Sequence, residues 1–73
     1  MSTVRTRFGK RLRYLRRHKD ITQEQLAEAI GVTSEFISNI ERGKSAPSFD
    51  TLEKLAEVLE IEIGELFPPS EDK

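Results

Sequence analysis

The sequence contains no cysteine, no tryptophan, one histidine and no long apolar run. Without cysteine the chain forms neither disulfides nor thiolate metal sites, which fits a reducing compartment. A membrane-spanning helix needs roughly 18 or more consecutive apolar residues, and residues 1–19 lack the apolar segment of a signal peptide. We therefore expect a cytoplasmic protein with no membrane partner.

Groups that carry catalysis or bind metal ions are also scarce. His18 stands alone in a basic segment, so neither a histidine acid/base pair nor a histidine metal site has support. Glutamates cluster between residues 57 and 65, but such a run is usually a solvated helix face, and a cation site is the minor alternative. No glycine loop of the nucleotide-binding kind is present. We expect no enzyme activity, cofactor, metal or small-molecule ligand.

Acidic residues are absent from the first 19 positions, although the net charge of the chain is −1. Of the 12 Lys and Arg residues, eight lie between Arg5 and Lys19, and all 13 acids lie at or after Asp20. A basic end joined to an acidic end offers phosphates an attractive surface while the whole protein stays slightly acidic. Composition alone leaves the alternative of a basic helix that is merely solvated.

The chain has 73 residues, which is room for one small domain with a single core. We predict this domain over residues 1–67. The Pro68-Pro69 pair ends regular structure, and residues 68–73 are predicted to form a flexible C-terminal tail.

Residues 21–44 predict two short helices joined by a tight turn. Thr22 and Gln25 have the spacing of a capping box at the start of the first helix. Gly31 ends that helix, because glycine enters the left-handed conformation at little cost, and Thr33 caps the next. A helix, a three-residue turn with glycine and a second helix form a helix-turn-helix.

The second of these helices, about residues 34–42, has two chemically different faces. At about 100° per residue, Phe36, Ile37 and Ile40 share one arc. The opposite arc carries short hydrogen-bonding side chains and one arginine: Ser34, Glu35, Ser38, Asn39 and Arg42. A solvated face is the alternative interpretation.

Apolar spacing predicts three further helices around this unit. The first carries Val4, Phe8, Leu12 and Leu15. The fourth, capped by Ser48, buries Leu52, Leu55, Ala56 and Leu59, flanked by Phe49 and Val58. A fifth, about residues 63–67, closes the core. The predicted fold is an all-α, compact five-helix bundle.

Five segments of the chain carry a family resemblance: TQEQLA, the turn IGV, ISNIERGKSAP, TLEKLAEVLEI and ELF. Together they resemble the lambda-repressor-like, Xre-type helix-turn-helix family of DNA-binding proteins over roughly residues 8–67. The resemblance implies a helix-turn-helix formed by helices 2 and 3. Asp20 and Glu60 stand where glycine is common in the family, and Glu62 stands where a capping serine is common. Aspartate tolerates the left-handed conformation, so we expect a modest cost at Asp20, whereas the glutamates leave the junction of the last two helices open.

The resemblance implies that the second helix of the motif enters the major groove of double-stranded DNA. The base-reading positions of the family map onto Ser34, Glu35, Ser38 and Asn39. Asn39 suits adenine N6 and N7, and Glu35 suits the amine of cytosine. Away from that amine a carboxylate is repelled by phosphate, so Glu35 either enforces specificity or lies at the edge of the contact.

Phosphate contacts would fix the register on the duplex. Gln23, in the first turn of its helix, matches a family glutamine that contacts the DNA backbone, and nearby N–H groups can assist it. The expected phosphate contacts are Thr22, Gln23, Thr33, Arg42, Lys44 and Ser45, with ordinary helix-end solvation as the alternative. Phe36 is expected in the core, with an aromatic shelf beside the DNA backbone as the alternative.

Two further expectations concern packing and assembly. The family pairs a glutamate with an arginine of the first helix, here Glu41 and Arg16, and we expect this ion pair to tie the two helices together. One copy reads only a few base pairs, so we expect a homodimer on a roughly palindromic site. The candidate dimer surface is Ile61, Ile63, Leu66 and Phe67.

The sequence thus predicts a small transcriptional regulator that binds double-stranded DNA sequence-specifically. The alternative is a protein-interaction adaptor, or antitoxin-type partner, that keeps the fold without reading DNA. The acidic net charge and Glu35 favour that alternative. Repressor and activator roles remain equally open.

Overall fold

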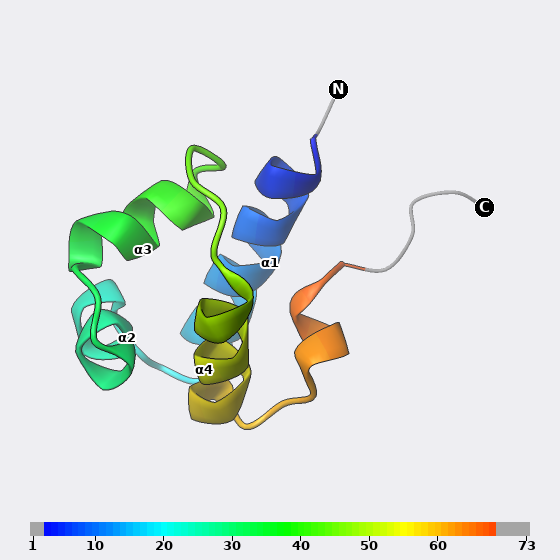
Figure 1. Ribbon diagram of the computed structural model, residues 1–73. Helices are drawn as coiled ribbons and strands as arrows, with labels where there is room; N and C mark the ends of the chain where they lie inside the picture. The colour runs from blue at the N-terminus through cyan, green and yellow to red at the C-terminus, as the bar shows by residue number, and fades with distance from the viewer. Residues whose placement is uncertain (1–2, 69–73) are drawn as a thin grey trace.

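The computed structural model describes residues 3–68 and is helical, with no strand in that range. Its elements are α1 (Val4–His18), α2 (Gln23–Ile30), α3 (Ser34–Glu41), α4 (Phe49–Leu59) and the short 3-10 helix η1 (Ile63–Leu66). Figure 1 shows α2 and α3 on one side of α1, and η1 on the other. The all-α prediction is confirmed. Residues 69–73 of the predicted tail lie outside the described range.

The C-terminal element corrects the predicted fifth α-helix, because η1 is a single 3-10 turn. The N–H of Glu65 donates to the carbonyl of Glu62 at 2.9 Å, and that of Phe67 to Gly64 at 3.2 Å. Pro68 has no N–H and biases the preceding residue toward extended backbone. Phe67 accordingly has φ −98° and ψ 138°, so the helix cannot continue. Four α-helices and one 3-10 turn make up the described fold.

Each α-helix begins at a serine or threonine whose side chain accepts a backbone N–H of the first turn: Thr3, Thr22, Thr33 and Ser48. The predicted capping box is confirmed. The Thr22 hydroxyl accepts from the Gln25 N–H at 3.0 Å, and the Gln25 side chain accepts from the Thr22 N–H at 2.9 Å. These local bonds determine where the helices begin.

Each α-helix also ends in the same way, at a residue with positive φ: Asp20, Gly31, Gly43 or Glu60. The next N–H bonds back across the last turn, as from Val32 to the Ala27 carbonyl at 3.0 Å. Lys19 and Glu60 join two of these helix ends, with Nζ 2.5 Å from Oε1. That hydrogen bond and the lysine charge lower the pKa of the exposed Glu60 carboxyl below its ordinary value.

The apolar faces of the four α-helices and η1 meet in one core: Phe8, Leu12, Leu26, Ala27, Ile30, Ile37, Ile40, Leu52, Leu55, Ala56, Leu59 and Leu66. Phe36 is partly buried against this core, as expected. Phe49, predicted to flank the buried stripe of α4, is instead 83 % exposed. It is the first residue of α4, and helical side chains tilt toward the N-terminus, so its ring extends beyond the edge of the core.

Helices α1 and α3 approach each other closely at Gly9 of α1. A Cβ atom placed at Gly9 would overlap the carbonyl oxygens of Ile40 and Glu41 at the end of α3. Glycine therefore allows α1 to lie directly against the backbone of α3. This contact positions α3 relative to the rest of the molecule.

Candidate nucleic-acid interface

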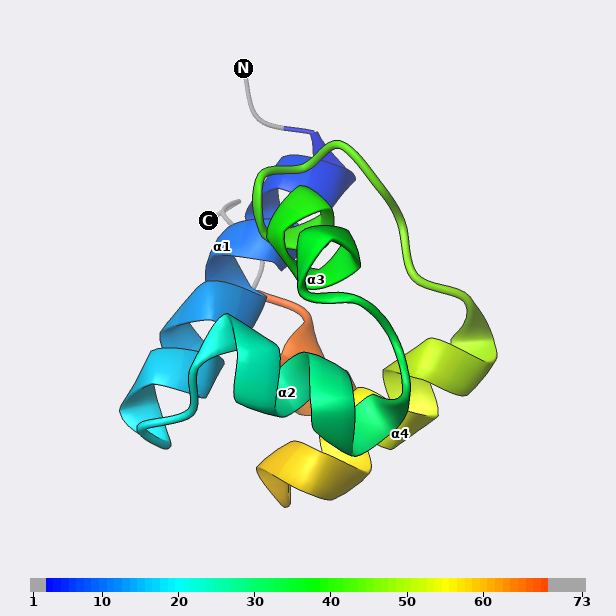
Figure 2. The same cartoon turned by 90° about the vertical axis from the view of Figure 1, so that its left-hand side faces the viewer.

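The two helices of the helix-turn-helix, α2 and α3, lie on the same side of the molecule (Figure 2). Gly31 makes the turn between them with φ 79°. Ile37 and Ile40 of α3 are each 0 % exposed, and their burial fixes the rotation of the helix about its axis. The opposite face of α3 is therefore presented outward.

The four predicted base-reading residues share this outer face of α3. Glu35 is exposed, and Ser34, Ser38 and Asn39 are partly buried. All four side chains are short and carry hydrogen-bonding groups, so together they form a polar strip along one short helix. The structure thus brings the predicted set together.

The predicted phosphate-contacting residues surround this strip. Thr22 and Thr33 are exposed caps whose hydroxyl oxygens accept backbone N–H groups, which leaves each hydroxyl proton available to a phosphate. Arg42 and Lys44 are exposed and Ser45 is partly buried, all directly after α3. Groups that can donate to phosphate therefore flank α3 at both of its ends.

Gln23 makes an internal contact that the sequence did not indicate. Its side-chain Nε2 donates to Glu41 Oε1 at 3.0 Å. The amide nitrogen carries a second proton, and the first N–H groups of α2 have no partner within the helix. Glu41 thus holds the Gln23 side chain in position, while the second amide proton of Gln23 and the first N–H groups of α2 can still donate to a ligand.

Arg16 and Glu41 form a bidentate ion pair between α1 and α3. Arg16 Nε lies 2.6 Å from Glu41 Oε2, and Nη2 lies 3.2 Å from Oε1. Both residues are 7 % exposed, and Arg16 Nη1 also donates to the Ile21 carbonyl at 2.7 Å. With Gln23 on the same carboxylate, this network connects α1, α2 and the end of α3. It is a rigid support behind the polar strip.

Asn39 and Arg42 make a second contact that the sequence analysis missed. Arg42 Nη2 donates to Asn39 Oδ1 at 3.1 Å. A guanidinium has no acceptor, so the Asn39 atom facing it must be the amide oxygen. The spacing of three residues on one helix face was the available signal.

Basic side chains of α1 lie next to the start of α2. A hollow between α1 and the start of α2 is lined by Arg13, Arg16, Arg17, Thr22, Gln23 and Glu24. Arg13 and Arg17 are exposed there, beside the positive end of the α2 dipole. Within residues 3–68, no group of three or more metal-ligating side chains gathers, and no helix is long and apolar enough to span a membrane.

The sequence matches the helix-turn-helix family over residues 12–66. The chain belongs to this family. The uncharacterised helix-turn-helix-type transcriptional regulator YazB of Bacillus subtilis is 40 % identical over 62 residues, which cover 85 % of this chain and 90 % of YazB. The control protein C.MunI of a Mycoplasma species is 40 % identical over 68 residues, 92 % of each chain. The predicted family is confirmed, and both relatives are named as regulatory proteins, not enzymes.

The solved structure of a controller protein agrees with the fold. The restriction-modification controller protein C.AhdI from Aeromonas hydrophila superposes with a TM-score of 0.82 at 42 % identity, over 85 % of this chain and 94 % of its own. The comparison therefore extends over nearly the whole of that small controller protein.

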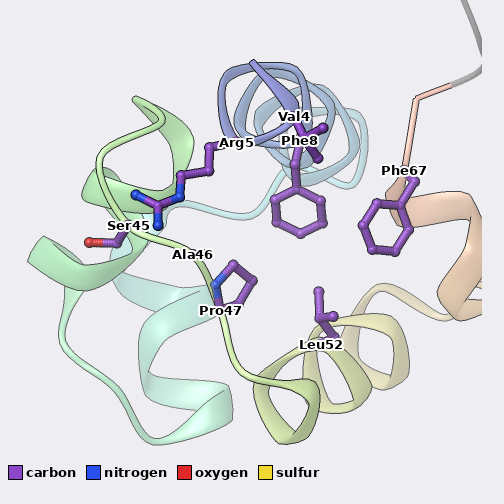
Figure 3. A pocket seen from close by; sticks show the side chains of 8 residues that line it. All are labelled: Val4, Arg5, Phe8, Ser45, Ala46, Pro47, Leu52 and Phe67. Carbon is purple, nitrogen blue, oxygen red and sulfur yellow. The ribbon is translucent and has the colours of Figure 1, made fainter.

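The predicted dimer surface of this helix-turn-helix chain is only partly exposed. Leu66 is 0 % exposed, so its prediction as a surface residue was wrong: the 3-10 turn points it into the core. Ile63 and Phe67 are 41 % and 42 % exposed, and Ile61 is partly buried. The Phe67 ring lies 5.3 Å from that of Phe8, centre to centre, beside a groove shown in Figure 3.

Proposed function

We propose that this protein binds double-stranded DNA sequence-specifically as a transcriptional regulator, with α3 in the major groove. The observation that carries this proposal is the polar strip of α3, presented outward while Ile37 and Ile40 on the opposite face are 0 % exposed. A groove-binding helix needs short donors and acceptors on its outer face. Membership of the helix-turn-helix family supports the same role. A cytoplasmic location is part of this proposal, since a transcriptional regulator must reach the DNA.

Base recognition is assigned to the polar strip. Glu35 only accepts hydrogen bonds when ionised, so it suits the N4 amine of cytosine. Ser34 and Ser38 can donate or accept and adapt to several bases. Asn39 has both an acceptor and donors. Each good bidentate contact discriminates by about 1–3 kcal/mol against a wrong base.

Phosphate contacts are assigned to the groups around the strip. Gln23 and the first N–H groups of α2 form a positive helix end that suits one phosphate. Thr22, Thr33, Lys44 and Ser45 can donate to phosphates on either side. These contacts would set register and supply most of the salt-dependent affinity.

The protein would act as a homodimer on a palindromic operator. An eight-residue helix reads only a few base pairs, and a two-fold pair of such helices would read half-sites about 34 Å apart or a multiple of that. The remaining candidate surface is Ile61, Ile63 and Phe67. An exposed fraction near two-fifths at Ile63 and Phe67 supports contact with a second copy.

The second candidate, a protein-interaction adaptor, is favoured by the acidic net charge and by Glu35 in the strip. The two functions differ in salt dependence. DNA binding weakens steeply between about 50 and 200 mM salt, because counterions are released from phosphates. An adaptor would show no such salt-dependent binding to duplex DNA.

The test is selection of bound duplexes from a random pool, repeated with Asn39→Ala. We expect the native protein to enrich an inverted repeat and Asn39→Ala to lose preference at a base pair in each half-site. Glu53→Ala, an exposed change on α4, is the matched control and should enrich the native sequence. Failure of the folded native protein to enrich any sequence at low salt would exclude the proposed function.

A further inference from the structure

Asn39 of the polar strip and Arg42, directly after α3, form a pair of side chains whose hydrogen-bonding groups are already oriented. Arg42 Nη2 donates to Asn39 Oδ1 at 3.1 Å, on the outer side of α3. Because the guanidinium offers only donors, it determines which atom of the amide faces it. The Asn39 nitrogen is therefore turned away from Arg42, with both of its protons available.

This arrangement distinguishes the two purines. An unrestrained asparagine pairs with adenine by accepting from N6 and donating to N7. Arg42 uses one of the two lone pairs of the amide oxygen, so an adenine N6 amine that approached the other would lie beside the guanidinium, donor against donor. Guanine places the acceptor O6 where adenine places that amine and keeps the acceptor N7. Guanine thus meets donors at both positions.

We propose that Asn39 and Arg42 act together to read guanine, with Arg42 as a specificity-determining residue and not a phosphate contact. This inference rests on the proposed function, since it requires α3 in the major groove. It replaces the pairing of Asn39 with adenine. The Asn39 nitrogen donates to guanine, and the guanidinium both fixes the amide and offers its remaining N–H groups to the second acceptor.

Arg42 is suited to this role by its position. It is the exposed residue directly after α3, about one helical turn after Asn39, so its side chain can return along the outer face of the helix. The Arg16–Glu41 network lies on the buried side of the same turn. Removal of the Arg42 side chain therefore leaves the internal support of α3 in place.

The experiment measures which base is preferred at the position that depends on Asn39. That position is identified as the base pair at which Asn39→Ala loses discrimination in the selection. The native protein should prefer guanine there by about 5- to 150-fold over adenine, the range that corresponds to one specific contact. Arg42→Ala should change the preferred base to adenine, because removal of the guanidinium takes away the donors that repel the N6 amine and frees both lone pairs of the amide oxygen.

Two controls separate specificity from general affinity. Lys44→Ala removes another exposed cation beside α3 and should weaken all sequences by a similar factor without changing the preferred base. Arg42→Met keeps the length of the side chain, and should also lose the preference for guanine. Circular dichroism of each variant establishes that the fold is retained.

A measurement with the native protein is independent of any variant. Replacing the selected guanine with 7-deazaguanine removes the N7 acceptor and should weaken binding several-fold. An adenine at the Asn39-dependent position in the native selection, no change of base in Arg42→Ala, or full affinity for the 7-deaza operator would each overturn the inference. In all three cases the proposed DNA-binding function would stand, because a sequence would still have been selected.

Discussion

At the scale of single residues, Gly9 and Gly64 lie in very different surroundings. A methyl group at Gly9 would overlap the backbone of α3, whereas a Cβ at Gly64 would have no atom within 4 Å outside its immediate neighbours. We predict that Gly9→Ala destabilises the protein by about 1–3 kcal/mol or more, since overpacking against backbone cannot be relieved by a side-chain rotation. In an exposed helix, by contrast, replacing glycine with alanine stabilises the protein.

Gly64→Ala is the matched control, and it should change the free energy of unfolding by less than about 0.5 kcal/mol or raise it slightly. Urea unfolding of the two variants beside the native chain measures both values. Equal stabilities for Gly9→Ala and Gly64→Ala would show that α1 and α3 do not approach as described.

The roles that can be predicted from sequence are those that depend on neighbouring residues in the chain. Thr22, Gln25 and Gly31 act through bonds within a few residues, so their spacing predicts their roles. Gly9 acts through a contact with residues more than 30 positions away, and the exposure of Phe49 depends on where the core ends. Neither property is contained in local spacing.

At the scale of elements, the Arg16–Glu41 pair supports the helix that we propose reads DNA. Both residues are 7 % exposed, so Glu41→Ala would leave a buried guanidinium without its carboxylate. We predict a loss of about 3–5 kcal/mol in the free energy of unfolding, measured by chemical denaturation.

The double change Arg16→Met with Glu41→Leu removes both charges and retains apolar volume. It should recover much of that loss, because buried ion pairs often contribute little net stability compared with apolar packing. If Glu41→Ala alone unfolded at the native denaturant concentration, the pair would not support α3. Separately, the DNA affinity of the folded double variant, compared with that of the native protein, measures how much the Arg16–Glu41 network contributes to the position of α3.

The sequence predicts a helix accurately where capping residues mark both of its ends, and less accurately where the segment is short. α2 and α3 have caps at their start and left-handed residues at their end, and both were predicted with their correct starts. η1 has only four residues before Pro68, too few for periodicity to distinguish an α-helix from a 3-10 turn. The polar strip of α3 was predicted, but the bond from Arg42 to Asn39 at the end of the strip was not, because helical spacing permits such a bond without requiring it.

At the scale of the whole molecule, the apolar surface near the C-terminal end should bring two copies together. Ile63 is 41 % exposed and belongs to η1. We predict that Ile63→Glu shifts the protein toward monomer and weakens operator binding, because a charge at the contact would have to be desolvated. Analytical ultracentrifugation with and without operator DNA measures both effects.

Ala29→Glu places the same charge on the exposed surface of α2 and serves as the control for dimerisation in the absence of DNA. It should leave the sedimentation of the free protein unchanged. A native protein that sediments as a monomer both free and on its operator would contradict the dimer.

The segregation of charge also belongs to this scale. Eight of the 12 Lys and Arg residues lie in α1 and the residue after it, while every acid lies at or after Asp20. This segregation gives α1 a dense positive charge, and near a duplex the exposed basic side chains of α1 would be drawn toward the phosphates. Net charge alone therefore underestimates its attraction to DNA.

The burial of Leu66 also determines how the chain can be shortened or extended. This leucine is fully enclosed and only two positions before Pro68, at the boundary of the described residues. A protease cut or a stop codon that removed η1 would open the hydrophobic interior to water, and a fusion partner inserted between α4 and η1 would do the same. Purification tags are therefore best attached beyond Pro68.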